Sequence, residues 1–176
     1  MSRDAKFYIL FVCSGNSCRS PLAEGLLRAK MPSRLQDDVE IKSAGTLGID
    51  GMPAARYSVE IVQERGGDLA GFRSQGVTAK LVEKTDLILA MAQEHIEYLQ
   101  ESFPQYRENI FLLKRFGRDA AEQNALDDDE VFDPVGSDKE TYLECADIID
   151  EELERIMPTL VKFIQERRRQ PNDTPA

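Results

Sequence analysis

The chain consists of short apolar runs separated by stretches in which apolar residues recur every three or four positions. Short runs rich in β-branched and aromatic residues are typical of buried strands. Such runs lie at residues 6–12, 39–43, 86–91 and 110–113. Helical spacing, with Pro, Thr or Gly at the ends, predicts helices at about residues 21–30, 53–65, 78–84 and 93–102. Strands and helices therefore alternate over the first two thirds of the chain.

The last third has a different pattern, because residues 115–136 show no periodicity. After Ser137, an apolar stripe predicts one face of a long helix. The stripe consists of Tyr142, Ala146, Ile149, Leu153, Ile156, Leu160 and Ile164. Pro158 lies inside it and should bend or interrupt the helix. We expect a single domain at residues 1–168 and a disordered tail at residues 169–176.

Alternating strands and helices predict an α/β fold, with a four-stranded parallel sheet flanked by helices on both faces. Ligands of such sheets bind at the carboxyl ends of the strands, near the point where the strand order reverses. The loop after the first strand and the long loop after the fourth both leave from this edge. Cys13 and Asp133, which lie in these two loops, are therefore expected to meet there.

Composition narrows the classes of function. The chain has 176 residues, a formal net charge of −10 at pH 7 and three cysteines. The negative charge argues against nucleic acid as a partner. No apolar run is long enough to span a bilayer and no signal-peptide pattern is present, which argues against a membrane partner. Since two of the cysteines share one loop, we expect a reducing, cytoplasmic location and no disulfide framework.

The loop between the first strand and the first predicted helix carries the candidate chemistry. Ser20 is the expected N-cap of that helix and Pro21 its first residue. A strand, a tight loop and a helix start direct backbone N–H groups and the positive end of a helix dipole into one concavity. An anion the size of phosphate would fit there.

Side chains of this loop add reactivity to the anion cradle. Cys13 is the candidate nucleophile, because amide donors, a helix N-terminus and a guanidinium all favour the thiolate. Arg19 carries a planar fork that can hold two phosphoryl oxygens at once. Ser20 can offer its hydroxyl to the sulfur, Gly15 permits a tight turn, and Asn16 can tie the loop with side-chain hydrogen bonds.

The string Val-Cys-x-Gly-Asn-x-Cys-Arg-Ser-Pro at residues 12–21 resembles the signature loop of low-molecular-weight protein-tyrosine phosphatases, a family that includes bacterial protein-arginine phosphatases. The similarity continues at residues 43–46, 89–91 and 133–134, and it covers about residues 5–165. It implies a cysteine-dependent protein phosphatase that forms a phosphocysteine intermediate and needs neither metal nor cofactor. The substrate would be a phosphorylated protein or peptide, and the product inorganic phosphate.

The same resemblance implies roles for individual residues. Cys13 would be the nucleophile, Arg19 the phosphoryl-binding cation, and Asp133 of the late Asp-Pro pair the general acid. The residues that would bind the phosphoryl group are Ser14, Gly15, Asn16, Ser17, Cys18 and Ser20. Without Pro134 and this resemblance, Asp133 would be interpreted as a solvated carboxylate of an acidic loop.

Phosphotyrosine and phosphoarginine are both candidate substrates. Tyrosine-directed members of the family usually carry a larger aliphatic residue where Ser17 stands, and arginine-directed members a threonine. Tyrosine-directed members also often have an aromatic residue at the position of Val135. Phe72 stands where many relatives have a histidine that steadies the loop. These departures concern recognition of the phenol and not the chemistry at phosphorus.

Two other functions are compatible with the loop. Arsenate reductases share the fold and often this string, but they need two further cysteines near the third strand, and residues 80–95 contain none. A non-catalytic phosphate or redox sensor is the second alternative. It would bind anions without hydrolysing p-nitrophenyl phosphate.

Other notable residues have ordinary interpretations beside functional ones. Cys18 is either a packing residue or a redox partner whose disulfide with Cys13 would shield the nucleophile. Cys145 flanks the apolar stripe, which predicts a core position. His95, the only histidine, falls on a predicted helix and is expected to be structural or exposed. The acidic run at residues 127–130 is interpreted as solvated surface, because consecutive carboxylates do not converge on one metal ion.

Overall fold

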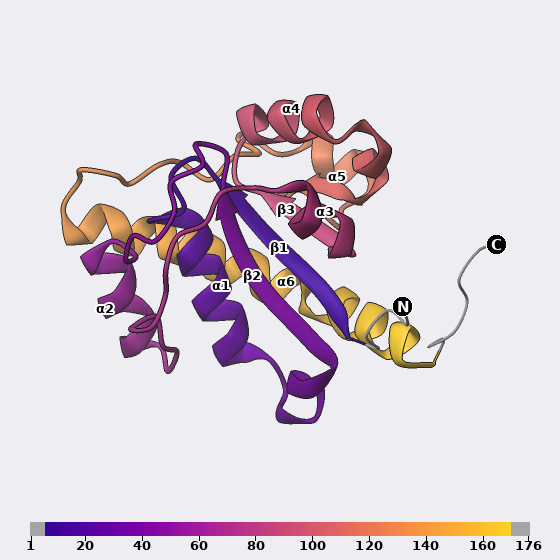
Figure 1. Ribbon diagram of the computed structural model, residues 1–176, viewed down its shortest axis with the longest axis horizontal. Helices are drawn as coiled ribbons and strands as arrows, with labels where there is room; N and C mark the ends of the chain where they lie inside the picture. Colours follow the sequence, from indigo (N-terminus) through magenta and orange to yellow (C-terminus); the bar gives the residue numbers. More distant parts are fainter. Residues whose placement is uncertain (1–5, 170–176) are drawn as a thin grey trace.

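The computed structural model of the protein describes residues 6–169. Its centre is a sheet of four parallel strands in the order β2-β1-β3-β4 (Figure 1). The strands are β1 (Phe7–Cys13), β2 (Val39–Gly45), β3 (Leu87–Ala90) and β4 (Ile110–Leu112). All four predicted strands are present, with ends shifted by at most two residues, and the predicted α/β fold is confirmed.

Helices cover both faces of this sheet. They are α1 (Arg19–Lys30), α2 (Arg56–Glu64), α3 (Ala79–Lys84), α4 (Gln93–Ser102), α5 (Ala120–Asn124) and α6 (Lys139–Arg169), with 3-10 helices η1 (Ser33–Asp38) and η2 (Pro104–Asn109). One apolar core lies between the sheet and α1, α2 and α6, and a second between the sheet and α3 and α4. None of the helices within residues 6–169 is long and apolar enough to cross a membrane.

Alternate residues of β1 supply the two cores, as expected for a strand buried on both faces. Ile9 and Phe11 belong to the core under α1 and α6, whereas Leu10 and Val12 belong to the core under α3 and α4. Cys13 continues the first of these rows and belongs to the same core. Its thiol therefore lies on the α1 side of the sheet, where the chain turns into the next helix.

The start of α1 differs from the prediction. The helix begins at Arg19, and its N-cap residue Cys18 makes no side-chain capping hydrogen bond. The prediction that Ser20 caps this helix was wrong, because the Ser20 hydroxyl contacts Cys13 instead. Pro21 is the third residue of the helix, where its missing N–H costs nothing, since the first-turn N–H groups have no intrahelical partner.

Other helix boundaries also correct the prediction. The helix expected from Pro53 begins at Arg56, because the N–H of Ala55 donates to Ser17 O (2.8 Å) and holds the preceding segment extended. The aperiodic stretch contains α5, a single short helix. Pro158 does not interrupt α6, which runs on to Arg169. The expected tail beyond that residue lies outside the described part of the chain.

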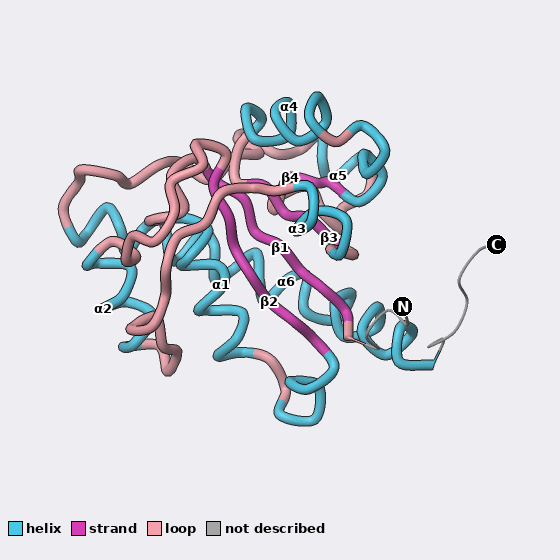
Figure 2. Tube along the Cα trace, in the orientation of Figure 1, coloured by secondary structure: helices cyan, strands magenta, loops and turns pink. Residues whose placement is uncertain are grey.

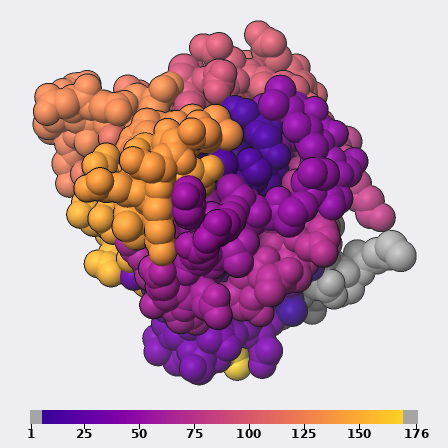
Figure 3. All heavy atoms as spheres, turned by 90° about the vertical axis from the view of Figure 1, so that its left-hand side faces the viewer, coloured from indigo at the N-terminus to yellow at the C-terminus, as the bar shows by residue number. Residues whose placement is uncertain are grey.

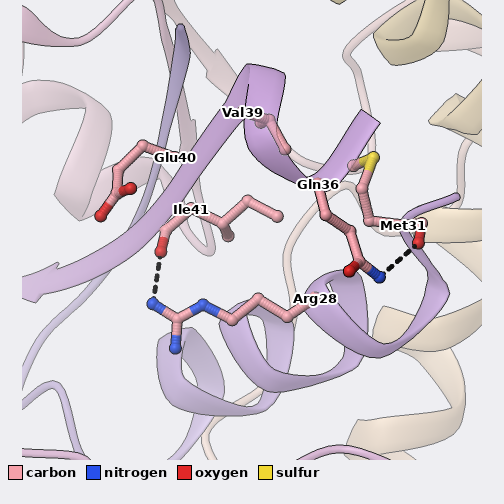
Figure 4. A pocket seen from close by; sticks show the side chains of 6 residues that line it. All are labelled: Arg28, Met31, Gln36, Val39, Glu40 and Ile41. Carbon is pink, nitrogen blue, oxygen red and sulfur yellow. Dashed lines mark hydrogen bonds between the residues drawn. The ribbon is translucent and has the colours of Figure 1, made fainter. Parts of the chain in front are cut away.

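The outer edge of β2 has two of its carbonyl groups occupied by side chains. Arg28 Nη2 donates to Ile41 O (2.6 Å), and Gln75 Nε2 donates to Ser43 O (3.0 Å). Figure 4 shows Arg28 reaching the strand beside a cavity of about 320 Å³. This cavity borders the amino-terminal half of β2, away from the edge at which Cys13 ends β1.

The carboxyl ends of the strands are covered by loops from distant parts of the chain (Figure 2). β1 lies between β2 and β3, so the loop that follows it begins where the strand order reverses. Figure 3 views the molecule from this side, and indigo atoms of the N-terminal region lie in a hollow there. Around them are the orange segment before α6, the purple segment after β2, and α4.

Candidate active site

The loop between β1 and α1 has its carbonyl groups turned away from its centre. The carbonyls of Cys13 and Ser14 accept from Thr46 N (2.9 Å) and Leu47 N (3.0 Å), and that of Ser17 accepts from Ala55 N. Because the C=O and N–H of one peptide unit point in opposite directions, this arrangement turns the following amides into the loop. Amides that point into a loop in this way are donors for an anion.

Asn16 ties the loop to its surroundings through all of its side-chain polar atoms. Its Nδ2 donates to Ser20 Oγ and Ser43 Oγ (both 2.9 Å), and its Oδ1 accepts from Gln75 N (2.9 Å). The residue is fully buried and has φ +53°, in the left-handed region that asparagine tolerates better than most residues. The predicted bracing function of Asn16 is present in the structure.

These contacts leave the hydrogen of the Ser20 hydroxyl available to the thiol. Cys13 Sγ lies 2.9 Å from Ser20 Oγ. Since Ser20 Oγ already accepts from Asn16 Nδ2, its own hydrogen is available for the sulfur. The serine can therefore stabilise a thiolate at Cys13. Both residues are almost completely buried.

Gly45, the last residue of β2, allows the loop to pass close to the sheet. A Cβ at this position would lie 2.5 Å from Ser14 O and 2.9 Å from Asn16 N. No side chain fits there without displacing backbone of the loop.

A buried carboxylate ends the hydrogen-bond chain behind the loop. Ser43 Oγ donates to Glu24 Oε2 (2.5 Å), and Arg28 Nη2 lies 2.7 Å from Glu24 Oε1. Burial raises the pKa of Glu24, while Arg28 and Ser43 act in the opposite direction. Sequence reasoning did not identify Glu24. Its one signal is a charged residue among the apolar residues 22–27 of a predicted helix.

Arg19 and Asp133 meet at the mouth of the loop. Arg19 Nη2 donates to Asp133 Oδ2 (2.8 Å) and to Ser14 Oγ (3.3 Å), and its Nη1 donates to Val131 O (3.2 Å). Arg19 is 4% exposed, whereas the Asp133 side chain is 40% exposed. The predicted approach of the two loops is thus present, and Asp133 reaches the site through an ion pair with Arg19.

His95 also lies at this site, which sequence reasoning missed. The residue is buried rather than exposed, with its Nε2 2.9 Å from Ser14 Oγ and its Nδ1 accepting from Ala92 N (3.0 Å). Burial lowers the pKa of His95 to about 4, and the charge of Arg19 acts in the same direction. His95 lies near the start of the helix that follows β3, so its position in the sequence could have indicated a place near the carboxyl ends of the strands.

The two other cysteines are buried thiols. Cys18 Sγ lies 3.0 Å from the hydroxyl of Tyr142, and burial is the main reason that its pKa is raised. Burial raises the pKa of the Cys145 thiol to about 12, and its position in the core is as predicted. All three cysteines are free.

Together, these residues form a recognisable chemical unit. A thiol lies at the base of a loop lined by amides, a guanidinium lies at its mouth, and a carboxyl group is within reach of the guanidinium. A sulfur nucleophile with an oxyanion-binding cradle and a nearby acid is suited to transfer of a tetrahedral anion. Fold and site therefore define the class of cysteine-dependent phosphatases.

Comparison with known proteins gives the family. The family model described as low molecular weight phosphotyrosine protein phosphatase matches residues 8–168. A protein-arginine-phosphatase of Bacillus subtilis is 32% identical over 161 residues, which are 92% of this chain and 99% of the relative. The low molecular weight protein-tyrosine-phosphatase Etp of Escherichia coli is 33% identical over 134 residues, 76% of this chain and 81% of the relative. This chain belongs to the low-molecular-weight protein phosphatase family.

A solved structure adds information on mechanism. The mutant of YwlE arginine phosphatase with a phosphorylated active-site serine has a TM-score of 0.74 and 30% identity to this chain, covering 89% of this chain and 97% of that one. Membership of the family makes the protein an enzyme, a phosphoric monoester hydrolase with cysteine-based chemistry that acts on phosphorylated proteins.

Proposed function

We propose that Cys13, Arg19 and Asp133 carry out the hydrolysis. The observation that supports these assignments most strongly is that Arg19 contacts both the loop of Cys13, through Ser14, and Asp133. The loop amides and Arg19 hold the three non-bridging phosphoryl oxygens, and Ser20 donates its hydrogen bond to the sulfur.

The reaction proceeds in two displacements. The Cys13 thiolate forms an S–P bond as the bond from phosphorus to the leaving oxygen or nitrogen breaks, and Asp133 gives its proton to that leaving atom. In the second step, the Asp133 carboxylate removes a proton from water as the water oxygen attacks phosphorus. The S–P bond breaks, the thiolate forms again, and inorganic phosphate is released.

Binding of the phosphoryl group prepares Asp133 for this function. In the free enzyme its carboxylate is paired with Arg19 at 2.8 Å. A phosphoryl oxygen that takes this position on Arg19 displaces the carboxyl group of Asp133 from the ion pair. Asp133 is then free to turn toward the leaving atom.

We assign phosphoarginine as the preferred side chain, with phosphotyrosine as the weaker substrate. Ser17 is small and polar, and the exposed residue after the Asp-Pro pair is Val135 instead of an aromatic wall for a phenol. One relative that this chain covers to 99%, at 32% identity, is named a protein-arginine-phosphatase. Rates on matched phosphoarginyl and phosphotyrosyl peptides test this assignment, and a faster phosphotyrosyl rate would reverse it.

The nucleophile is tested by Cys13→Ser. We expect this variant to lose turnover of p-nitrophenyl phosphate while it still binds vanadate, because the loop amides and Arg19 remain. The matched control is Cys145→Ala, which changes a buried thiol outside the loop. Retained turnover in Cys13→Ser would overturn the assignment. Loss of turnover in the control as well would show that the two variants fail for a structural reason.

A cytoplasmic location accords with this chemistry. The mechanism needs Cys13 as a free thiol, and a reducing compartment keeps it in that form. The other two cysteines are free as well.

A further inference from the structure

We infer that His95 is a positioning residue of the catalytic loop, which acts through Ser14 to hold the guanidinium of Arg19. The inference rests on the proposed function of Arg19 as the phosphoryl-binding cation. His95 itself touches neither Cys13 nor Asp133 by any hydrogen bond found within residues 6–169.

The hydrogen-bond partners of His95 determine which nitrogen carries its proton. Nδ1 accepts from the N–H of Ala92, the N-cap residue of α4 (3.0 Å), so Nδ1 is unprotonated. The single proton of the neutral ring is therefore on Nε2, which lies 2.9 Å from Ser14 Oγ. The side chain is 1% exposed, so water does not replace either contact. His95 Nε2 thus donates to Ser14, and Glu94 Oε1 is a more distant neighbour at 3.4 Å.

Ser14 connects this histidine to the arginine. Its Oγ accepts from His95 Nε2 and from Arg19 Nη2 (3.3 Å), so its own hydrogen is directed to the remaining neighbour, Glu94 Oε1 (3.3 Å). All three contacts are satisfied by one orientation of the hydroxyl. An oxygen fixed in this way is a stationary acceptor for the guanidinium.

The consequence for catalysis follows from what the substrate displaces. When a phosphoryl oxygen replaces Asp133 on Arg19 Nη2, the ion pair that helped to orient the guanidinium is lost. Ser14 Oγ and Val131 O are the contacts that remain. Preorganised donors stabilise a transition state better than donors that must be ordered during the reaction. His95 therefore maintains the orientation of Arg19 at the moment when the phosphoryl group is bound.

A purely structural function of His95 predicts a different result. Through Nδ1 the residue accepts from the N–H of the N-cap residue of α4, so a substitution that removes this acceptor also removes a helix cap. Ser14→Ala separates the two functions, since it breaks the link to Arg19 and leaves the cap intact. Thr78→Ala is the matched control, because Thr78 Oγ1 caps α3 by accepting from Leu81 N, on a helix that has no part in the site.

The experiment is a double-mutant cycle with His95→Gln and Ser14→Ala, read by vanadate inhibition and by kcat/KM for p-nitrophenyl phosphate. We expect each single variant to weaken vanadate binding and lower kcat/KM by about 10- to 100-fold, the effect of one hydrogen bond to a charged group. The double variant should lose no more than the worse single one, because both act on one chain of contacts. Ser14→Thr, which keeps the hydroxyl, should restore most of the binding.

Additive losses in the double variant would overturn the inference. So would unchanged vanadate binding in Ser14→Ala, or the same loss of binding in Thr78→Ala. If His95→Gln does not fold, the comparison of Ser14→Ala with Ser14→Thr still tests the inference, because only the alanine variant lacks the hydroxyl that links His95 to Arg19. Failure of the proposed function would be distinguishable, since the wild-type enzyme would then fail to hydrolyse p-nitrophenyl phosphate while vanadate binding could still be compared.

Discussion

The two loops that meet at the site are built in opposite ways. The loop of Cys13 is braced by side chains that are fully inaccessible to solvent, those of Asn16 and of Ser20 in the first turn of α1. The loop of Asp133 is exposed, since its side chain is 40% exposed and that of Val135 64%. The first loop is fixed by hydrogen bonds between buried side chains, whereas Asp133 accepts from Arg19 and from the N–H of Val135.

This difference suits the chemistry that we propose for each loop. A nucleophile and its anion cradle gain from being held in place before the substrate arrives. An acid that leaves Arg19, gives up a proton and then activates water has to move relative to the phosphoryl group. Substitutions on the two sides should therefore separate activity from stability.

Asp133→Ala should produce the largest loss of activity with little loss of stability. Without the proton donor, hydrolysis of phenyl-type esters should slow by about two to four orders of magnitude. The free energy of unfolding should fall by about 1 kcal/mol or less, because Asp133 is 40% exposed and the buried Arg19 keeps its hydrogen bonds to Ser14 and Val131. Steady-state kinetics and urea unfolding measure both quantities. Asp127→Ala, an exposed carboxylate of the same stretch, is the control, and an unchanged rate in Asp133→Ala would exclude this residue from the mechanism.

Asn16→Ala should instead reduce activity and stability together. The substitution removes three buried hydrogen bonds and places alanine in the left-handed region, so we expect a loss of about 2–4 kcal/mol in the free energy of unfolding. Activity should fall about 100-fold, because the loop loses its shape. Asn124→Ala, at an exposed position of α5, serves as control. If Asn16→Ala were inactive but as stable as the wild type, the hydrogen bonds of Asn16 would shape the loop without contributing to the free energy of unfolding.

The smallest expected effect concerns His95, whose protonation makes the free energy of unfolding depend on pH. Burial and the charge of Arg19 lower its pKa to about 4 in the folded state, so between about pH 6.5 and pH 4 the unfolded chain binds the extra proton. Stability is therefore full above this window and falls as the pH decreases through it, by about 1–2 kcal/mol at pH 5.

Urea unfolding of the wild type and of His95→Gln at several pH values tests this expectation. The variant should show a flatter dependence over the same window, although Arg19, Glu94 and Asp133 surround the ring and act on it in both directions. Parallel curves for the two proteins would contradict the prediction.

The elements of the fold could be predicted where local pattern and tertiary packing agree. The apolar runs of β1 and β3 are buried on both faces, so their sequence alone identifies them. The prediction was wrong where tertiary contacts override a local signal. The Ser20 hydroxyl contacts sulfur instead of capping α1, and Pro158 is held inside α6 by buried neighbours such as Ile156 and Leu160. The short helix α5 could have been found from its Asp119–Glu122 capping box.

The site could be predicted where its residues lie in the Cys13 motif or, for Asp133, in the late Asp-Pro pair that the family resemblance singles out. Cys13, Arg19 and Asn16 were identified because the loop that contains them is continuous in sequence. Glu24 and His95 were not, because their contacts with the loop arise from the packing of α1 and α4 against the sheet. A single histidine on a helix has no sequence signal that separates a buried donor from a solvated side chain.

The most direct test of the account is to trap the intermediate on Cys13. Asp133→Ala enzyme is mixed with p-nitrophenyl phosphate, whose leaving group departs without help, denatured within the first turnover, digested and examined by mass spectrometry. The account predicts that the peptide containing Cys13 carries the mass of one phosphoryl group, because hydrolysis of the intermediate lacks its base. Turnover without this modification, or a phosphoryl group on another residue, would contradict it.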